Sequence, residues 1–373
     1  MADNNENKVL NVPHLRFPEF SGEWKKHSLG EIGETIIGLT YKPSDVVDNN
    51  GIIVFRSSNI KNGMIDYSDL VRVNKHIKDK IITKENDILV CARNGSQRLI
   101  GKNAIIKQED ANNTFGAFMM VYRANDNPFI LPLLSTKKYF SQVGENLGAR
   151  INQITTSDFN GFEFYFPENH AERTKIAELF RLLDERIATQ NKIIEDLKKL
   201  KSAITDLLFH SIADAHTIRL GEIAHITNGA GDVQDANTEH QEDWYPFFDR
   251  SEELKWFPTY SFDKEAVIYA GEGQSFYPRY YNGKFALHQR CYAITDFASC
   301  IIPKYCYHFM NTLNSYFVRN SVGSTVPSLR MDIFQKVEIR LPPIPKQQHI
   351  CKIIDAFYTK LEVEQRGISI LQE

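Results

Sequence analysis

The sequence predicts an α+β protein in which a mixed α/β domain followed by a long helix occurs twice. Three observations support this prediction. Apolar residues repeat in heptads over residues 172–208, a related repeat lies near the end of the 373-residue chain, and short motifs before each repeat recur in the same order. Repetition on this scale indicates one structural unit that is used twice.

The first long helix is predicted over 172–208 because apolar residues recur there at alternating steps of four and three. This spacing places them on one helix face, as in the seam of a coiled coil. The segment contains no Gly or Pro, and its Ala, Leu, Lys, Glu and Arg residues favour helix. Such a helix is roughly 55 Å long. The seam positions are Ile176, Phe180, Leu183, Ile187, Gln190, Ile194, Leu197, Lys201, Ile204 and Leu208.

The second long helix is predicted near the end of the chain as the partner of the first. It repeats the first seven seam positions at a constant offset of 174, beginning with Ile350 against Ile176. The polar position is kept, since Glu364 corresponds to Gln190. An apolar seam is unstable in contact with water, so we expect the two helices to pack together. The positions are Ile350, Ile354, Phe357, Leu361, Glu364, Ile368 and Leu371.

The sequence before each helix also repeats. The middle of each half, around 40–130 and 230–300, is much less alike than its ends. A shared framework with a different interior is typical of two domains that recognise different targets. The corresponding segments are 29–32 and 220–223, which both spell Leu-Gly-Glu-Ile, then 148–154 and 323–329, and 162–167 and 337–342.

Within both halves, we expect strands to outnumber helices. Helices are predicted over 132–143 and 303–319. Strands are predicted at 52–55, 87–92, 104–107, 118–123 and 162–166 in the first half, and at 267–270, 285–294 and 337–341 in the second.

Composition excludes several classes of protein. Hydrophobic residues make up 42% and charged residues 24% of the chain, which is ordinary for globular domains. No apolar run is long enough to span a bilayer, and the polar start is unlike a signal peptide. The five cysteines lack C-x-x-C spacing, so we expect reduced thiols in a cytoplasm and no metal site. The net charge of −3 predicts weak affinity of this chain alone for nucleic acid.

Motifs for catalysis are missing from the sequence. Residues 95–103 resemble a phosphate-binding loop, but five residues separate Gly95 from Gly101, and Asn103 stands where Ser or Thr would contact magnesium. A turn between strands is the better interpretation. No Asn-Pro-Pro-Tyr or Asp-Pro-Pro-Tyr segment, G-x-S-x-G, H-E-x-x-H or glycine-rich dinucleotide motif occurs. We therefore expect no catalytic residues and no cofactor in this chain.

Recognition remains, and polar segments of the first half are candidates for it. Residues 56–59 (Arg-Ser-Ser-Asn) follow a predicted strand and can hydrogen-bond to base edges or phosphates. The loop at 148–153 carries a guanidinium and two carboxamides, the groups that read guanine and adenine. The alternative is an ordinary polar loop for the first segment and a cap on the helix-to-strand connection for the second. The candidates for DNA contact here are Thr40, Tyr41, Lys42, Arg56, Ser57, Ser58, Asn59, Asn94, Ser96, Arg150, Asn152 and Gln153.

The second half offers a different set of candidates. Residues 276–281 interleave aromatic rings with a cation, a pattern suited either to packing against nucleic acid or to a hairpin with buried rings. Strand alternation at 288–290 would put His288 and Arg290 on one face and Gln289 on the other. Arg250-Ser251 is expected to occupy the place of Arg56-Ser57. The candidates are Arg250, Ser251, Arg279, Tyr280, Gln289, Arg290, Ser324, Thr325, Ser328 and Arg330.

With its doubled plan, Leu-Gly-Glu-Ile segments, Arg56–Ile60, glycine loops and heptad helices preceded by Pro, the chain resembles the specificity subunit of a Type I restriction-modification enzyme. The resemblance covers about residues 24–371. It implies an α+β fold of two mixed α/β target recognition domains in pseudo-twofold repeat, separated by two long conserved helices packed as an antiparallel coiled coil. The second helix is short against that pattern. The implied domains are a first target recognition domain at 1–166, a central helix at 167–211, a second target recognition domain at 212–341 and a C-terminal helix at 342–373.

The resemblance implies a non-catalytic DNA-binding subunit of the bacterial cytoplasm, with no membrane partner. Each domain would read half of a bipartite target in double-stranded DNA. Two methyltransferase subunits would bring S-adenosylmethionine, and restriction subunits using ATP and magnesium would join through them. Alternatives are a coiled-coil scaffold, a stand-alone DNA-binding regulator and a catalytic DNA enzyme.

The helix between the domains is expected to fix the spacer of that target. It lacks Pro and Gly, and a helical rod resists bending where a flexible linker does not. Removal of one heptad, such as Glu195–Lys201, should shorten the spacer by up to about 10 Å, or about three base pairs.

Overall fold

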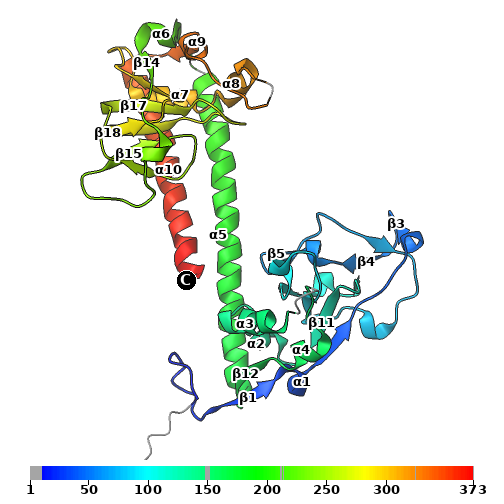
Figure 1. The fold of residues 1–373 in the computed structure, drawn as a ribbon. Coiled ribbons are helices and arrows are strands. Elements are labelled where there is room, and N and C mark those ends of the chain that lie inside the picture. Colours follow the sequence, from blue (N-terminus) through cyan, green and yellow to red (C-terminus); the bar gives the residue numbers. More distant parts are fainter. Residues whose placement is uncertain (1–10, 148–151, 211, 213, 324, 373) are drawn as a thin grey trace, which may run out of the picture. The chain divides into compact units, whose positions relative to one another are not determined.

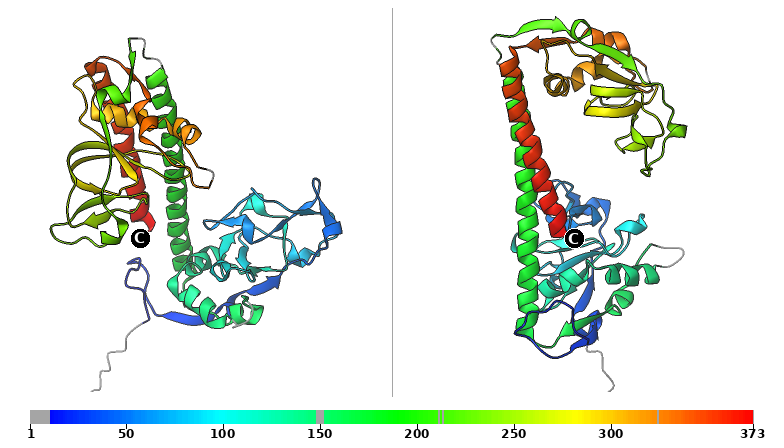
Figure 2. Two further views of the ribbon diagram at one scale, coloured as in Figure 1. Left: turned by 45° about the horizontal axis from the view of Figure 1, so that its top comes forward. Right: turned by 90° about the vertical axis from the view of Figure 1, so that its left-hand side faces the viewer.

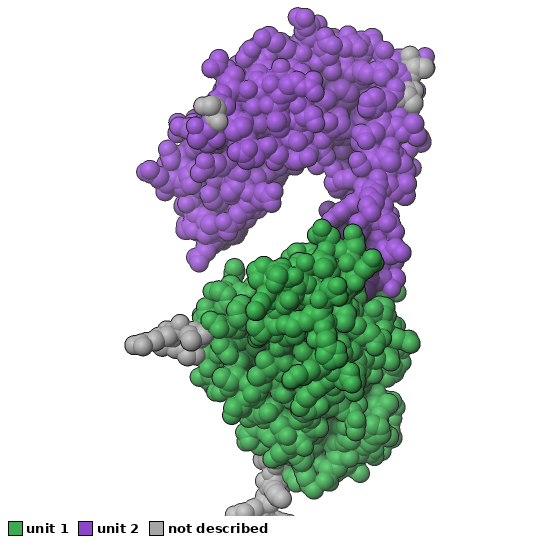
Figure 3. Space-filling model, turned by 90° about the vertical axis from the view of Figure 1, so that its right-hand side faces the viewer, with its two compact units in different colours: residues 1–186 green, residues 187–373 purple. Residues whose placement is uncertain are grey.

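The computed structural model describes residues 11–147, 152–210, 212, 214–323 and 325–372. The chain divides into two compact units, Met1–Arg186 and Ile187–Glu373 (Figure 3). Each unit contains a sheet-rich domain and part of the long helix α5 (His170–His210) (Figure 1). The predicted α+β class with two long helices is confirmed, while the domain boundaries proposed from the sequence stay a prediction.

The strands of the first unit form two four-stranded sheets. All their pairings are antiparallel except that of β10 with β4. The order is β2 (Glu34–Ile37), β11 (Met119–Arg123), β8 (Ile88–Cys91) and β9 (Asn103–Ile105) in one sheet, and β10 (Thr114–Phe115), β4 (Ile52–Phe55), β7 (Arg72–Val73) and β3 (Val46–Val47) in the other. The hairpin β5 (Ile60–Lys61) and β6 (Met64–Ile65) follows β4.

Short helices and a strand pair enclose the core of this unit. Tyr122, Tyr139, Phe159 and Phe162 are fully buried there and pack edge-on or tilted against one another. These elements are α1 (Leu29–Ile32), α2 (Asn127–Leu133), α3 (Lys137–Asn146), α4 (Thr156–Asn160), and β1 (Trp24–Ser28) paired antiparallel with β12 (Glu163–Pro167).

The helix predicted over 132–143 is wrong, because the structure has two helices there. Thr136 is the N-cap of the second helix, since its hydroxyl accepts a hydrogen bond from the Tyr139 N–H. Pro132 near the end of α2 offers no N–H to continue a helix.

The second unit has one six-stranded sheet. Helix α7 packs between this sheet and the C-terminal helix α10 (Ile344–Gln372) (Figure 1). The strand order is β14 (His225–Asn228), β19 (Cys291–Thr295), β17 (Phe262–Ala270), β18 (Arg279–Leu287), β15 (Tyr245–Phe248) and β16 (Lys255–Phe257). The other elements are α6 (Leu220–Ile223), α7 (Pro303–Met310), α8 (Asn314–Asn320), α9 (Met331–Gln335) and the antiparallel pair β13 (His216–Arg219) and β20 (Glu338–Leu341).

Two predicted elements of this half are also wrong. The strand expected over 285–294 is broken by a tight turn, closed by the Cys291 N–H donating to the His288 carbonyl at 2.9 Å. The helix expected over 303–319 is divided into α7 and α8, and the Thr312 hydroxyl between them bonds the Phe309 carbonyl. A hydroxyl that bonds the preceding turn competes with helical bonding, which favours a break at this point.

The two domains share one strand plan. The order β2, β11, β8, β9 in the first unit corresponds to β14, β19, β17 and the first part of β18 in the second. β10 pairs parallel with β4 in the first unit, and the end of β18 pairs parallel with β15 in the second. The repeat therefore extends through the middle of each domain, where the sequences are least alike.

In the second unit, α10 packs along α5 as an antiparallel coiled coil (Figure 2). Gln190 bonds Glu364, the Lys201 ammonium lies 4.0 Å from the centroid of the Tyr358 ring, and Phe209 shares an apolar core with Ile350. Contact partners thus descend along α10 as they ascend along α5, which defines antiparallel packing. The predicted seam within this unit is buried or half-buried at Ile187, Ile194, Leu197, Ile204, Ile350, Ile354, Phe357, Leu361 and Ile368.

Three seam positions fall in the first unit. Ile176 packs against the core of that domain and Leu183 is half-buried. Phe180 is 40% exposed, so its predicted burial in a seam is wrong here. The counterpart Ile354 in α10 is only 2% exposed, because it lies in the core that also holds Phe209 and Ile212. Periodicity thus identifies residues able to form a seam, whereas burial depends on a helix being present opposite them.

Within the described part of the chain, no helix combines the length and apolar character needed to cross a membrane. Over the same residues, no cluster of three or more His, Cys, Asp and Glu side chains is placed to hold a metal ion.

Candidate nucleic-acid interface

Four separate segments of the first unit meet at one end of its sheet. The turn after β10 joins β4, because the Gly116 N–H donates to the Phe55 carbonyl at 2.9 Å. Arg93, just beyond β8, donates its N–H to the Phe118 carbonyl at 3.0 Å and bridges to Gln153. We call residues 55–59, 93–96, 116–118 and 152–153 the first sheet end.

Equivalent segments meet in the second unit, where Leu329 and Gly271 correspond to Ile154 and Ala92, which are joined by an N–H to carbonyl bond of 3.0 Å in the first unit. The His288 N–H donates to the Phe248 carbonyl at 2.9 Å, and the Leu329 N–H donates to the Gly271 carbonyl at 2.7 Å. Glu272 forms a bridge with Ser328, as Arg93 does with Gln153. We call residues 248–251, 271–273, 288–290 and 327–328 the second sheet end.

A glycine in each unit lets the chain pass close to this site. A Cβ atom at Gly38 would overlap the carbonyl oxygen of Gly116, and one at Gly229 would overlap that of Leu287. Both glycines donate their N–H to the strand that follows the turn, at 3.4 Å to Met119 and 3.2 Å to Cys291. Any larger residue would force these segments apart.

The backbone register fixes which residues of the two sheet ends are equivalent. Phe55 corresponds to Phe248, because each accepts the hydrogen bond from the turn. Arg56 therefore corresponds to Asp249, and the prediction that Arg250 takes the place of Arg56 is wrong by one residue.

Side chains from three segments contact one another at the first sheet end. Asn94 donates its amide to the Ser57 hydroxyl at 2.9 Å, and its own amide oxygen accepts from the Ser96 N–H at 2.9 Å. Asn152 donates its amide to the Gly95 carbonyl at 3.0 Å. Candidates that lie far apart in the sequence are thus brought together on one surface.

Two residues of the first sheet end, Arg56 and Asn59, hold its loop in place through bonds within the domain. Asn59 is 0% exposed, accepts from the Arg56 N–H at 2.9 Å and donates to the carbonyls of Asp66 and Asp69. Its prediction as a DNA contact is therefore wrong, because its amide holds the loop after β4. Arg56 is half-buried and pairs with Asp69 at 2.8 Å, while Ser58 is exposed beside it.

The candidates Thr40, Tyr41 and Lys42 follow the segment that borders the first sheet end. Leu39, just before them, donates its N–H to the Phe115 carbonyl at 2.7 Å. Thr40 and Lys42 are exposed, whereas Tyr41 packs against a buried apolar cluster that includes Leu39.

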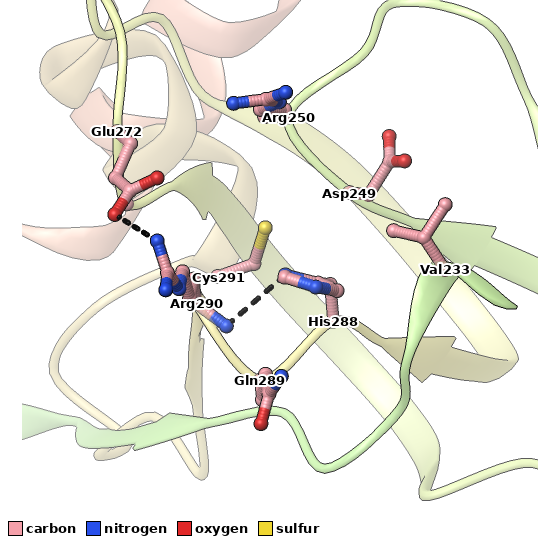
Figure 4. Close-up of a pocket in the computed structure, with 9 residues that line it drawn as sticks. Val233, Asp249, Arg250, Glu272, His288, Gln289, Arg290 and Cys291 are labelled. Carbon is pink, nitrogen blue, oxygen red and sulfur yellow. Dashed lines mark hydrogen bonds and ion pairs between the residues drawn. The ribbon is translucent and has the colours of Figure 1, made fainter. Parts of the chain in front are cut away.

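The second sheet end surrounds a pocket of about 280 Å³ (Figure 4). Arg290 projects from the turn with 67% of its side chain exposed, and its Nη1 donates to the Glu272 Oε1 at 2.8 Å. The backbone N–H of Arg290 donates to His288 Nδ1 at 3.2 Å. Gln289 and Arg250 are exposed at the same site. The strand alternation predicted for 288–290 is wrong, because these residues form the turn between β18 and β19.

A buried carboxylate supports the second sheet end. Asp249 is 4% exposed, accepts from the Lys255 ammonium at 2.6 Å and from the Ser251 N–H at 2.7 Å. Burial works to raise the pKa of Asp249, but these two donors outweigh it, and the pKa lies below its ordinary value. The carboxylate therefore stays charged and fixes the loop after β15.

Arg279 and Tyr280 also act within the domain. Arg279 donates to the Ser251 carbonyl and lies 6.0 Å from the centroid of the Phe248 ring. Tyr280 donates to Glu265, and its ring centroid lies 5.8 Å from that of Tyr307. Half-buried rings in a strand match the hairpin interpretation of this segment.

The glycine loops are described only in part. Arg150 and Ser324 lie outside the described residues. Thr325 and Arg330 are exposed, and Ser328 is half-buried with its hydroxyl on the Val326 carbonyl at 3.3 Å.

Arg93 is not among the residues predicted from the sequence. Its guanidinium carbon lies 5.0 Å from the centroid of the Phe118 ring, and both side chains are exposed. An exposed Phe in a Gly-Ala-Phe turn beside a strand was the available signal, but its pairing with Arg93 depends on the register of β8 and β11.

The fold and its two sheet ends define a duplicated protein, in which one α/β framework, used twice, presents two different polar surfaces. The family model of the Type I restriction modification DNA specificity domain matches residues 21–199 and again residues 213–372. The chain belongs to this family.

The chain is similar in sequence to part of each of two curated relatives. The chain is 30% identical over 149 residues to the Type I restriction enzyme EcoDI specificity subunit of Escherichia coli, covering 40% of this chain and 32% of that protein. It is 28% identical over 193 residues to the EcoKI specificity subunit of Escherichia coli strain K12, covering 48% and 41%. The matched segments thus span about a third to two-fifths of these relatives.

The fold of the chain is similar to that of two solved structures over nearly its whole length. The Type I restriction-modification S subunit from M. genitalium has a TM-score of 0.63 at 18% identity, covering 94% of this chain and 93% of that chain. A chain from a study of complex assembly and conformational transition of the type I R-M system has a TM-score of 0.56 at 16% identity, covering 96% of both.

Proposed function

We propose that this chain is the non-catalytic DNA-binding subunit of a Type I restriction-modification enzyme, and that each domain reads half of a bipartite target in double-stranded DNA. The observation that carries the proposal is the repeated sheet end, where one backbone framework presents two dissimilar sets of polar side chains. Contacts to base edges specify sequence, so two dissimilar sets predict two dissimilar half-sites.

The charge of the chain supports a role within a complex. Its net charge is −3, and the second sheet end holds Asp249 and Glu272 close to Arg290. Neutralisation of phosphates supplies much of the affinity of DNA-binding proteins. Partner subunits therefore have to provide many of the phosphate contacts.

A second apolar stripe on the coiled coil supports docking of methyltransferase subunits. On α5, Ile193, Leu200 and Leu207 are exposed and seven residues apart, so they share one helix face. On α10, Val363 and Ile370 are also exposed and also lie seven residues apart. Exposed apolar surface of this kind is typical of protein interaction sites.

Two methyltransferase subunits would dock on these helices and bring S-adenosylmethionine. Restriction subunits, which use ATP and magnesium, would join through them. No cofactor is assigned to this chain, and its work is recognition in a bacterial cytoplasm.

The test is to reconstitute the full chain with Type I methyltransferase subunits and S-adenosylmethionine and to map the methylated adenines. We expect one bipartite motif with a gap of constant length. Methylation by the chain alone would instead indicate a catalytic enzyme, and sequence-specific binding without partners would indicate a regulator. Duplex DNA left unbound by the reconstituted complex would indicate a scaffold.

Docking is tested separately. Leu200→Glu combined with Leu207→Glu should weaken methyltransferase binding at least about tenfold, because charge at an apolar interface is costly. Lys199→Glu is the matched control, since Lys199 is exposed and pairs only with Glu195 on its own helix surface at 2.7 Å among described residues. Equal binding by the leucine variant and the control would contradict the docking site.

A further inference from the structure

We propose that Arg93 and Arg290 are the base-reading arginines of the two domains, and that each recognises the guanine of a G·C pair. The proposal rests on the function proposed above and names the residues and the base through which each half-site is read.

The backbone places these arginines in a common frame. Cys91 pairs with Met119 in the first unit, and Ala270 pairs with Cys291 in the second. Met119 therefore corresponds to Cys291, and the residues just before them, Phe118 and Arg290, correspond to each other. By the same register, Arg93 corresponds to Glu272, in agreement with their equivalent bridges to Gln153 and Ser328.

One position follows the strand (Arg93 or Glu272), and the facing position lies in the turn (Phe118 or Arg290). In both domains these two positions hold an arginine and its partner, but in opposite order. In the first domain the arginine follows the strand and its partner is in the turn. In the second domain the arginine is in the turn and its partner, Glu272, follows the strand. The framework thus presents one arginine at each sheet end from either of two positions.

A cation–π contact holds Arg93 without using its hydrogen-bond donors. The guanidinium carbon lies over the Phe118 ring, 5.0 Å from its centroid. In the described part of the chain, the Arg93 guanidinium donates no hydrogen bond. Phe118 itself is 58% exposed and contributes little to the core.

Among the described residues, one hydrogen bond holds the guanidinium of Arg290. Its Nη1 donates to Glu272 at 2.8 Å, while 67% of the side chain is exposed (Figure 4). Glu272 is the less exposed partner, with 23% of its side chain accessible. An ion pair this exposed adds little to stability, so stability of the domain does not account for the pairing.

The chemistry of the arginine identifies the base. Arginine bound to O6 and N7 of guanine in the major groove is the commonest specific contact between protein and DNA. An arginine whose side chain is already oriented loses less entropy on binding. Phe118 and Glu272 are positioning residues in this scheme.

The test uses the full chain reconstituted with methyltransferase subunits, on duplexes carrying the motif mapped for the wild type and on duplexes with single base pairs changed. Arg290→Ala should lower discrimination at one G·C pair by about 10- to 100-fold and leave the other half-site unchanged. Arg93→Ala should do the same in the other half-site. Arg290→Lys keeps the charge and should retain affinity better than discrimination.

A base analogue separates base reading from phosphate contact. At the implicated position, 7-deazaguanine lacks the N7 acceptor and should weaken binding by the wild type but not by the matching alanine variant. Glu272→Gln and Phe118→Leu should reduce discrimination at the same base pairs as Arg290→Ala and Arg93→Ala, respectively.

Arg219→Ala and Arg181→Ala are matched controls. Arg219 lies next to α6, before β14 begins, whereas the second sheet end lies beyond the other end of β14, and Arg181 pairs with Glu178 and Glu185 on α5. Both controls should keep the wild-type motif, and all variants should melt at the wild-type temperature.

Three results would overturn the proposal: an equal loss of binding on every sequence, unchanged discrimination, or relaxation of the same half-site by both alanine variants. Failure of the proposed function looks different, because the wild-type complex would then recognise no motif at all.

Discussion

The two sheet ends have the same backbone connections and opposite charge placement. The first residue after β4 is Arg56, and the first residue after the equivalent strand β15 is Asp249. Each forms an ion pair with a residue farther along the chain, Arg56 with Asp69 and Asp249 with Lys255. The arginine and its partner at the facing positions are likewise exchanged. A framework of backbone hydrogen bonds therefore tolerates reversal of charge, which allows the side chains to diverge while the fold is kept.

The largest expected effect comes from exchanging most of the second domain, including its sheet end. Replacement of residues 230–330 by those of another family member should change one half of the methylated motif and leave the other half and the spacer unchanged. The reason is that the framework bonds use backbone atoms, which any side-chain set can preserve. Methylation mapping measures the outcome, and a change in both halves would show that the sheet ends do not act independently.

The seam positions Ile354 and Phe180 give the next contrast. Ile354→Ala should destabilise the protein by about 2–5 kcal/mol, because it leaves a cavity in a closed core. Phe180→Ala should cost less than about 1 kcal/mol in the chain alone, since surface positions contribute little. Urea unfolding followed by circular dichroism compares the two variants. Equal losses would mean that Phe180 is covered in solution.

The two ion pairs should differ in strength. Lys255→Met removes the partner of a buried carboxylate and should cost about 1–3 kcal/mol. Asp69→Asn should cost less than about 0.5 kcal/mol, because 59% of the Asp69 side chain is exposed. Unfolding of the two variants under one buffer is the measurement, and the opposite ranking would refute the assignment of Asp249 as the supporting carboxylate.

The same carboxylate predicts a dependence on pH. The folded-state pKa of Asp249 is lowered, so its stabilisation is complete above the unfolded value of about 4 and is lost as the pH falls through the folded value. Lys255→Met removes a donor that lowers this pKa and should flatten the acid limb of stability. An identical acid limb in the variant would contradict this cause.

The smallest expected effect concerns His308 in helix α7 of the second unit. Helix α2 of the first unit contains no histidine. His308 is buried, and burial lowers its pKa more than the bond to Asp355 at 2.9 Å raises it. The unfolded chain therefore takes up a proton first, so stability should fall as the pH drops below about 6.5. His308→Gln should remove part of this slope, as measured by thermal melting across the range. A slope unchanged in the variant would assign it to other groups.

The sequence predicts elements whose signal is local. The seam from Ile187 to Leu208 follows from heptad spacing alone, and it is buried or half-buried as expected. The turn at 288–290 was missed because His-Gln-Arg contains neither Gly nor Pro and apolar residues flank it on both sides. Propensity therefore favoured one long strand, whereas pairing with β15 and β17 divides it.

The sites divide in the same way. Ser57, Asn94 and Asn152 were singled out by residue type, and the structure places them together. Arg93 could not be selected by type, because its distinction is a contact with Phe118 set by strand register. Asn59 has a side chain able to hydrogen-bond to DNA, but it is buried. Its burial depends on the packing of the loop around it, which the residue type does not indicate.

The central claim is that the equivalent sheet ends contact different halves of one DNA target. Ala117 and Gln289 stand at the middle of the equivalent turns, and both are exposed. A photocrosslinking amino acid at either position, in the complex with methyltransferase subunits, reports which bases lie nearby. We expect crosslinks from Ala117 to one half-site and from Gln289 to the other. Crosslinks from both positions to the same half-site, or from neither to DNA, would contradict it.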